Sequence, residues 1–366
     1  MKVLSVLGAR PNFIKTAPVI LELRRRRIEH VLVHSGQHYD KALSQFILED
    51  LGMPDADYNL GVGSGSHGVQ TGNILKALDP VILRENPDVV LVPGDTNTTL
   101  AGALAAVKLG VPVAHIEAGV RAASHYRSDR FSLQPERINR PVVDQVSDFL
   151  FCPTRQSGQN LRREGVPRGK IHVVGDTMLD VFRETLPRAL RQGRGVEAMG
   201  LQPGRFILLT LHRPGNVDEV RSLTRILNSC EASGETVYFP AHPRTTRSLR
   251  RIRKRYRNIR FAPPARYLDF LLLLKNARLL ITDSGGAPKE AMWSRTPCIT
   301  LQDETEWVET VEARANVLAG WTPGERTLVP LIRRMLRAKV AFRGKPYGDG
   351  HASQRIVDIL ERDVGR

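Results

Sequence analysis

The 366-residue sequence is poor in several kinds of residue, and each shortage excludes a class of protein. It has three cysteines, none in a CxxC pair or at a zinc-site spacing from a histidine, which excludes a disulfide framework and a cysteine zinc centre. Aromatic residues make up only 6%, so aliphatic side chains must fill the cores. No uncharged apolar run reaches the ~18 residues that cross a bilayer, and the first residues lack the pattern of a signal peptide. We therefore expect a soluble, cytoplasmic protein without a membrane partner.

Lysine is also scarce, with 11 lysines and 43 arginines against 38 acidic residues, and the formal net charge is +16. An arginine-rich chain reflects either the codon usage of a GC-rich genome or an affinity for anions such as a phosphorylated ligand. The two basic runs, 24–27 and 247–260, continue helical patterns, and we interpret them as solvated helix faces. We expect no nucleic-acid partner, because that interpretation rests on net charge alone and conflicts with the placement of the polar motifs at strand ends. Binding that weakens steeply with salt would favour it.

Short apolar runs alternate with stretches of helical spacing along the chain. The expected strands are 3–7, 31–34, 89–92, 111–116, 149–152, 171–174, 206–210, 236–239, 259–261, 279–282 and 298–301. The expected helices are 12–26, 40–51, 98–109, one from 155, 217–230, 244–255, 267–276, one from 287, and 351–363. Strands separated by helices are typical of parallel sheets covered on both faces. With the polar stretch 188–205 as a connection between domains, the sequence predicts two doubly wound α/β sheets with a ligand cleft between them.

Polar and ionisable residues follow nearly every expected strand. They lie in the stretches 8–15, 35–40, 93–99, 115–119, 211–216, 240–244 and 283–286. One such stretch alone is usually a turn, but ligands of open α/β sheets bind at the carboxyl ends of the strands. Because these stretches recur in both halves, we expect functional residues in both.

Ser284, Gly285 and Gly286 are the expected phosphate cradle, because they follow a buried strand and open a helix whose N–H groups and dipole attract an anion. Glu290, on the first turns of that helix, is suited to accept hydrogen bonds from ribose hydroxyls. The alternative is that Ser284 only caps the helix. The pattern is neither a P-loop nor a GxGxxG fingerprint, which argues against an NTPase or a dehydrogenase.

Asp95, Glu117 and Glu136 are candidates for general acid and general base, because the environment can separate the pKa values of paired carboxylates. The alternative is that they cap helices or pair with arginines. His212 can carry a proton or contact a phosphate, although a lone histidine beside a strand is more often structural. The motif His-x-Glu at 115–117 has no third ligand at a telling spacing, so we expect no metal.

A set of strings together carries a specific resemblance. In chain order they are GARPNFIK at 8–15, GDTNTTLAGALAA at 94–106, HIEAGVR at 115–121, PERINR at 135–140, LHRPGNVD at 211–218, HPR at 242–244, TDSGG at 282–286 and PYGDG at 346–350. They resemble the UDP-N-acetylglucosamine 2-epimerase family, whose members have two Rossmann-like domains facing across a cleft, the GT-B arrangement. The resemblance implies an N-terminal domain at 1–184, a UDP-binding domain at 185–348, and a helix at 349–366 that returns to the N-terminal domain.

The resemblance also implies roles for single residues. The family's catalytic acid and base carboxylates and its essential histidine are matched by Asp95, Glu117, Glu136 and His212. Arg10 and Lys15 match cations near the diphosphate and the sugar. The residues matched to the substrate and UDP site are Arg213, His242, Ser284, Gly285, Gly286 and Glu290.

The chemistry of that family explains these residue types. No carbonyl lies beside C2 of an N-acetylhexosamine, so its hydrogen is not acidic. Family members expel UDP from C1 while C2 is deprotonated, form a 2-acetamidoglucal, and add UDP back with protonation on the opposite face. This reaction needs no redox cofactor and no metal. The resemblance therefore implies a cofactor-independent, homodimeric isomerase that converts UDP-GlcNAc to UDP-ManNAc.

The sequence departs from the family pattern at several points. GQHYD at 36–40 replaces a QHRE-type stretch that helps other members bind a second, activating UDP-GlcNAc, SGGAPKE replaces SGGxQEE, and the 122–134 loop looks longer than usual. QDETEWVE at 302–309 loses two arginines and resembles the branch that acts on UDP-2,3-diacetamido-2,3-dideoxyglucuronate. That substrate is the first alternative. The others are a hydrolysing epimerase that releases ManNAc and a GT-B glycosyltransferase that needs an acceptor.

Overall fold

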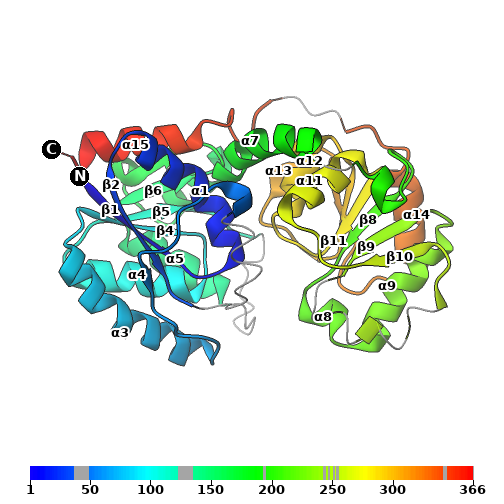
Figure 1. The fold of residues 1–366 in the computed structure, drawn as a ribbon, viewed down its shortest axis with the longest axis horizontal. Helices are drawn as coiled ribbons and strands as arrows, with labels where there is room; N and C mark the ends of the chain where they lie inside the picture. Colours follow the sequence, from blue (N-terminus) through cyan, green and yellow to red (C-terminus); the bar gives the residue numbers. More distant parts are fainter. Residues whose placement is uncertain are drawn as a thin grey trace. The chain divides into compact units, whose positions relative to one another are not determined.

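The computed structural model of the chain describes residues 1–36, 49–122, 135–192, 195–241, 245, 248–249, 252, 255–340 and 344–365. These residues form two compact units (Figure 1). The first unit contains Met1–Arg121, the residues 135–184 and the C-terminal segment from Lys345, and the second contains Thr185–Gly344 with Ala122. Within the described part of the chain, no helix is both long and apolar enough to cross a membrane.

The first unit is built on a parallel sheet of seven strands. In spatial order they are β3 (Tyr58–Asn59), β2 (Glu29–His34), β1 (Lys2–Leu7), β4 (Val89–Pro93), β5 (Val113–Ile116), β6 (Phe149–Cys152) and β7 (Ile171–Val173). Ser5 of β1 pairs with Leu32 on one side and Leu91 on the other. Successive residues enter opposite cores, with Val3 in one and Leu4 in the other, as the two-residue period of a strand requires.

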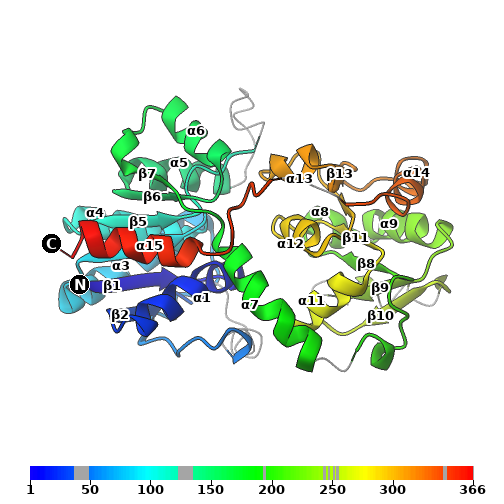
Figure 2. The same cartoon turned by 90° about the horizontal axis from the view of Figure 1, so that it is seen from above.

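Helices cover both faces of this sheet, as Figures 1 and 2 show. One face carries α3 (His67–Glu85), α4 (Asn97–Lys108) and α5 (Glu136–Val146), and the other carries α1 (Arg10–Arg25) and α15 (Ala352–Asp363). The remaining helices that begin in this unit are α6 (Arg155–Arg163), the short 3₁₀ helix η2 (Arg168–Lys170) and α7 (Thr177–Gln192).

The C-terminal helix α15 packs beside α1 in the first unit (Figure 2). Ile356 and Leu360 share a core with Val19 of α1. Arg26 adds ion pairs across the two helices, with nitrogen-to-oxygen distances of 2.6 Å to both Asp358 and Glu361. The basic run at 24–27 therefore includes an arginine that connects two helices, in addition to side chains in solvent.

The second unit contains a parallel sheet of six strands. In spatial order they are β10 (Ile259–Ala262), β9 (Val237–Pro240), β8 (Ile207–Thr210), β11 (Leu279–Thr282), β12 (Cys298–Thr300) and β13 (Asn316–Leu318). On one face Ile207 packs with α9 (Val220–Ala232) and α14 (Glu325–Met335), and on the other Leu208 packs with α11 (Tyr267–Asn276) and α12 (Ala287–Ser294). The shorter helices are α8 (Pro214–Val217), α13 (Val308–Glu312) and the 3₁₀ helix η3 (Glu197–Met199).

The strand order reverses once in each sheet, between β1 and β4 in the first unit and between β8 and β11 in the second. At such a reversal the loops at the carboxyl ends of the two strands diverge, and ligands of open α/β sheets bind there. Two doubly wound parallel sheets confirm the predicted fold class. The reversals place the candidate sites after β1 and β4 and after β8 and β11.

The stretch 188–205 differs from the expected connection between domains. The boundary between the units falls after Glu184, inside α7, and α7 continues to Gln192. Val196 and Leu201 are buried in the core of the second unit. Apolar residues within this polar stretch therefore attach it to the second unit.

Candidate functional site

The turns after β4 and β5 place two carboxylates next to cations in the first unit. Lys15 Nζ, from α1, contacts the Oε2 atom of Glu117, and Nη2 of Arg140, from α5, lies 2.5 Å from the Oδ2 atom of Asp95. Gly94 lies against the first pair with φ +70°. A Cβ atom on Gly94 would be 3.2 Å from Lys15 Nζ and 3.5 Å from a carboxylate oxygen of Glu117. The positive φ favours glycine, and an added Cβ atom would displace the Lys15 ammonium by a few tenths of an ångström.

Glu117 is held in an unfavourable backbone conformation. Its φ is +68° and its exposed fraction is 4%, and a non-glycine residue in this region costs about 1–3 kcal/mol. Burial alone would lower the pKa of Lys15, but the attraction of Glu117 and Asp95 outweighs burial, so the pKa of Lys15 is raised above its ordinary value. Lys15 is thus an ammonium ion beside the Glu117 side chain.

Helix α5 supplies the polar groups that hold the turn after β4. The side-chain amide of Asn139 donates to the backbone oxygen of Asp95 over 2.8 Å, and Arg140 pairs with the Asp95 carboxylate. Glu136 is the first residue of the helix, one turn before Arg140, and is half-buried. The third predicted carboxylate therefore lies on the helix that positions Asp95.

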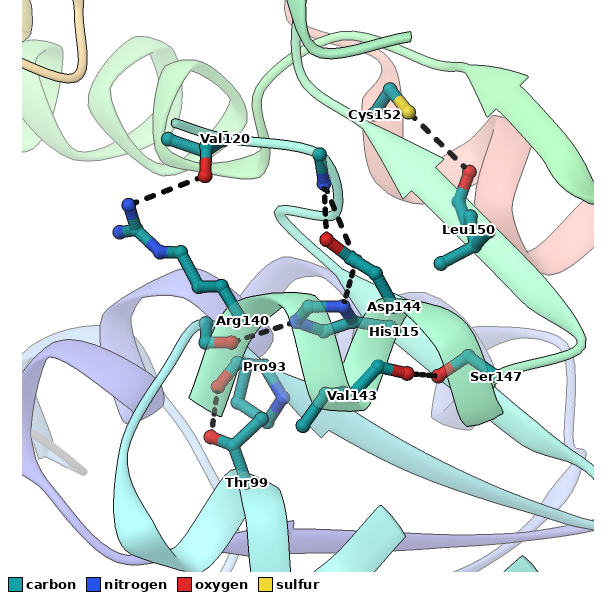
Figure 3. A network of polar contacts seen from close by, with 12 residues as sticks. Pro93, Thr99, His115, Val120, Arg140, Val143, Asp144, Ser147, Leu150 and Cys152 are labelled. Atoms are coloured by element: carbon teal, nitrogen blue, oxygen red, sulfur yellow. Dashed lines mark hydrogen bonds and ion pairs between the residues drawn. The ribbon is translucent and has the colours of Figure 1, made fainter. Parts of the chain in front are cut away.

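A buried histidine–aspartate pair lies next to these turns (Figure 3). His115 Nδ1 is 2.8 Å from Oδ1 of Asp144, and Nε2 is 2.7 Å from the backbone oxygen of Gly94. Arg121 donates to Asp144 and to Glu164 over 2.7 Å. Because both ring nitrogens of His115 have protein partners, the histidine of the His-x-Glu motif offers no nitrogen to a metal.

Asp283 organises the turn after β8 in the second unit. Its carboxylate accepts hydrogen bonds from the backbone N–H groups of His212 and Arg213 and from the side-chain amide of Asn216, over 3.0–3.1 Å. Its backbone oxygen accepts from Gln302 over 2.7 Å. Burial would raise the pKa of Asp283, but hydrogen bonding and attraction from His212, together with the other donors, lower the pKa below its ordinary value.

His212 is oriented by this buried carboxylate. Its Nδ1 atom lies 2.9 Å from Oδ1 of Asp283, while its side chain is 49% exposed. A histidine whose Nδ1 is held by an aspartate has a defined tautomer and keeps Nε2 for a reacting group, as in hydrolase triads. The arrangement can therefore deliver or accept a proton at Nε2.

The Ser-Gly-Gly turn leads into α12 as expected. The Ser284 hydroxyl accepts from the N–H of Ala287 over 3.4 Å, so this residue makes the weak capping contact of the alternative interpretation. A cation also lies beside the turn, because Nη2 of Arg213 is 4.0 Å from where a Cβ of Gly285 would stand. The Arg213 guanidinium lies over the ring of Trp321, 5.8 Å from its centroid. A helix N-terminus with an adjacent arginine is suited to a phosphate.

Helix α12 also carries two buried charged residues. Glu290 accepts a hydrogen bond of 2.8 Å from the hydroxyl of Tyr267. Lys289 is fully buried, and its Nζ lies 3.5 Å from the ring centroid of Trp307. Both Lys289 and Trp307 belong to the segments that depart from the family pattern, SGGAPKE and QDETEWVE, so these two departures contact each other.

Several predictions concern residues that the structure does not place. Arg10 is the first residue of α1, but its side chain lies outside the described part of the structure. His242 lies outside the described residues, and so do residues 37–40 of GQHYD and residues 123–134 of the long loop.

Two residues that hold the candidate groups are not singled out by the sequence. Asp283 stands only at a strand end, and Arg140 only within a motif. The signal for both is topological: Asp283 follows β11, the neighbour of β8, and Arg140 lies one turn after Glu136 on α5. An acidic residue at the second strand of a switch point is therefore a candidate partner for a histidine at the first.

A family model described as UDP-N-acetylglucosamine 2-epimerase matches residues 21–361. The chain belongs to this family. A relative from Methanocaldococcus jannaschii, named UDP-N-acetylglucosamine 2-epimerase, is 41% identical over 372 residues, covering 98% of this chain and 99% of the relative. A relative from Pseudomonas aeruginosa, named UDP-2,3-diacetamido-2,3-dideoxy-D-glucuronate 2-epimerase, is 42% identical over 374 residues, covering 99% of this chain and 100% of the relative.

Solved structures agree with this assignment. The crystal structure of the M. jannaschii UDP-GlcNAc 2-epimerase in complex with UDP-GlcNAc and UDP superposes with a TM-score of 0.88 at 41% identity, covering 99% of this chain and 100% of that one. A glycotransferase of kitacinnamycin, with a TM-score of 0.59 at 12% identity over 100% of this chain and 94% of that one, shares the fold alone. The family inferred from the motifs is confirmed.

Proposed function

We propose that this chain is a cofactor-independent 2-epimerase that converts UDP-GlcNAc to UDP-ManNAc. The observation that carries the proposal is the cluster after β4 and β5, beside the reversal of strand order between β1 and β4. There Glu117 is paired with Lys15 and Asp95 with Arg140. Two carboxylates, each beside a cation, suit a reaction that removes a proton from one face of a carbon and returns a proton to the other.

In this proposal the second unit binds the nucleotide. The Ser284–Gly286 turn before α12 and the Arg213 guanidinium stabilise the negative charge that collects on UDP as the C1–O bond breaks. Nε2 of His212 hydrogen-bonds or protonates the diphosphate, and Asp283 keeps the ring in place. Glu290, held by Tyr267, accepts from the ribose hydroxyls.

The first unit handles the proton at C2. Glu117 and Asp95 divide the roles of base and acid between the two faces of the sugar, with Glu136 as the third carboxylate near the start of α5. As the C2 proton leaves to one carboxylate, the C2–H electrons form the C1–C2 double bond of the 2-acetamidoglucal and UDP departs with the C1–O electrons. Return of UDP to C1 and of a proton to the other face of C2 completes the inversion. No redox cofactor takes part in these steps.

A second substrate is favoured by one specific observation. The segment 302–309, whose Trp307 lies against Lys289, resembles the diacetamidoglucuronate branch, and the relative of that name is 42% identical. UDP-2,3-diacetamido-2,3-dideoxyglucuronate is therefore the alternative substrate, with the same elimination and re-addition at C1 and C2. The carboxylate of that sugar would be attracted by arginine side chains, which are abundant in this chain.

The proposal includes a homodimer in the cytoplasm. Exposed apolar side chains on the first unit are candidates for a subunit contact: Val69 and Leu83 on α3, and Ile138 and Val142 on α5. Large exposed apolar side chains can mark an interaction surface. Light scattering of the purified protein gives about twice the chain mass of 40.8 kDa if the dimer forms, and the monomer mass contradicts it.

Product analysis tests the function. Purified protein is incubated separately with UDP-GlcNAc and with UDP-2,3-diacetamido-2,3-dideoxyglucuronate, and the sugars are identified by NMR. UDP-ManNAc from the first supports the main proposal, and turnover of the second alone supports the alternative. Free ManNAc with UDP identifies a hydrolysing epimerase, and release of UDP only when a sugar acceptor is added identifies a glycosyltransferase.

A further inference from the structure

His115 is a fully buried histidine that joins the two turns carrying the candidate carboxylates. Both His115 and Asp144 have essentially no exposed side-chain surface. The Gly94 oxygen can only accept a hydrogen bond, so Nε2 of His115 carries a proton and donates it to that oxygen over 2.7 Å. Figure 3 shows the ring beside the Asp144 carboxylate, with Arg140 on the same helix as Asp144.

The His115–Asp144 pair is hydrogen-bonded to backbone groups that lie one residue from Asp95 and two residues from Glu117. Gly94 precedes Asp95, and its carbonyl oxygen is the one that accepts from His115. Asp144 accepts from the N–H of Gly119, over 3.2 Å and 3.3 Å, two residues after Glu117. The turn after β4 and the turn after β5 are therefore attached to the same side-chain pair.

The turn after β5 needs such an attachment. Glu117 has φ +68°, and a non-glycine residue in this conformation persists only where the surroundings hold it. Burial would raise the pKa of Asp144, but the attraction and hydrogen bonds of His115 and Arg121 lower it, so the carboxylate is ionised and accepts strongly from the Gly119 N–H.

We propose that His115 and Asp144 are positioning residues for the epimerisation, because they set the distance and direction of the Asp95 and Glu117 carboxylates through the backbone of Gly94 and Gly119. This inference rests on the proposed function. Neither side chain touches the substrate, since both are enclosed by protein. A shift of about 1 Å in a catalytic group can cost on the order of 10²-fold in rate.

A graded series of substitutions tests the proposal. His115→Ala removes both contacts, whereas His115→Gln keeps a side-chain N–H that can reach the Gly94 oxygen. We expect kcat for C2 proton exchange to fall about 10²-fold in His115→Ala, with partial recovery in His115→Gln. The KM for UDP-GlcNAc and the Kd for UDP should stay within about twofold, because the nucleotide residues belong to the second unit.

Glu164→Gln is the matched control. Glu164 belongs to the same buried network through Arg121 but contacts neither Gly94 nor Gly119 in the bonds that hold the turns. All variants are assayed at a fixed interval below their own Tm. Should His115→Ala not fold, Asp144→Asn replaces it, because it removes the charge and one of the two oxygens that accept from Gly119, with little change in volume.

The outcomes separate the two proposals. If the wild-type protein exchanges no C2 proton, the proposed function fails. If the wild-type protein exchanges the C2 proton but the folded His115 and Asp144 variants keep the wild-type kcat, the positioning proposal is wrong. It is also wrong if their kcat falls no further than that of Glu164→Gln for the same loss of Tm. A parallel loss of UDP affinity would also contradict it.

Discussion

The Nδ1 atom of His212 lies 2.9 Å from the Oδ1 atom of Asp283, at the point where neighbouring strands β8 and β11 end. The carboxylate is fully buried while the histidine is half exposed. An exposed histidine ring would ordinarily rotate. Here the Asp283 carboxylate holds the ring nitrogen and is itself held in place because it also accepts from the backbone N–H of His212. The pair therefore presents Nε2 in one orientation, which is a requirement for proton transfer.

Asp283→Asn is expected to lower kcat by about 10²–10⁴-fold, because an amide cannot accept from all of the donors and can favour the wrong histidine tautomer. Steady-state kinetics with UDP-GlcNAc measure the effect, and circular dichroism checks the fold. Asp349→Asn is the control, since Asp349 is paired with Arg355 within the first unit and is not part of this turn. A folded Asp283→Asn protein with wild-type kcat would show that the carboxylate does not orient the histidine.

Stability should depend on pH through Asp144 and Asp283. The folded-state pKa of each is lowered below the ordinary value of 3.8, so each carboxylate stabilises the fold above that value, and the stabilisation is lost as pH falls through the folded pKa. Urea unfolding between pH 2 and 6 should show a decline in stability that starts below about pH 4. The decline should be shallower in Asp283→Asn, and an unchanged slope would contradict this assignment.

Lys15→Met leaves the Glu117 carboxylate buried without its ammonium partner. Removing one member of a buried ion pair costs about 3–5 kcal/mol, and urea denaturation at pH 7 measures the loss. The double variant Lys15→Met/Glu117→Gln should regain much of that stability because no uncompensated charge remains. If the double variant is as unstable as the sum of the single ones, the two residues are not coupled in the folded protein.

Gly94→Ala should reduce activity more than its backbone strain explains. A residue with φ near +70° costs about 1–2 kcal/mol when it gains a Cβ, and at Gly94 that atom would also press on Lys15. Gly110→Ala is the matched control, because Gly110 has φ +74° and nothing within 4 Å of the added atom. We expect similar strain in both variants but a loss of kcat only in Gly94→Ala, measured at equal margins below Tm.

Much of the fold could be predicted because both sheets are parallel and buried on both faces. Strands such as Val89–Pro93 then read as continuous apolar runs between turn residues. The edge strands β3 and β13 have only two and three residues, so their apolar runs are too short to be predicted from the sequence. Helix α5 escaped prediction because it buries Asn139, Arg140 and Asp144, so its inward face is polar where a core helix is apolar.

The candidate site could be predicted in part. Lys15, Asp95 and Glu117 stand in strings that identify the family, and the structure brings all three together. The partners of the site could not be predicted, because they are distant in sequence: Asp283 binds His212 across 71 residues, and Asp144 binds His115 across 29. Such pairs can be identified only once the order of the strands is known.

The most direct test of the account is the fate of the C2 hydrogen. Purified protein and UDP-GlcNAc are mixed in D₂O and followed by proton NMR, with Glu117→Gln and Asp95→Asn alongside. We predict that the wild-type protein replaces the C2 hydrogen of recovered UDP-GlcNAc with deuterium as UDP-ManNAc appears, while both variants bind UDP without exchange. A wild-type protein that binds UDP-GlcNAc and the diacetamidoglucuronate but exchanges the C2 hydrogen of neither would contradict the central claim.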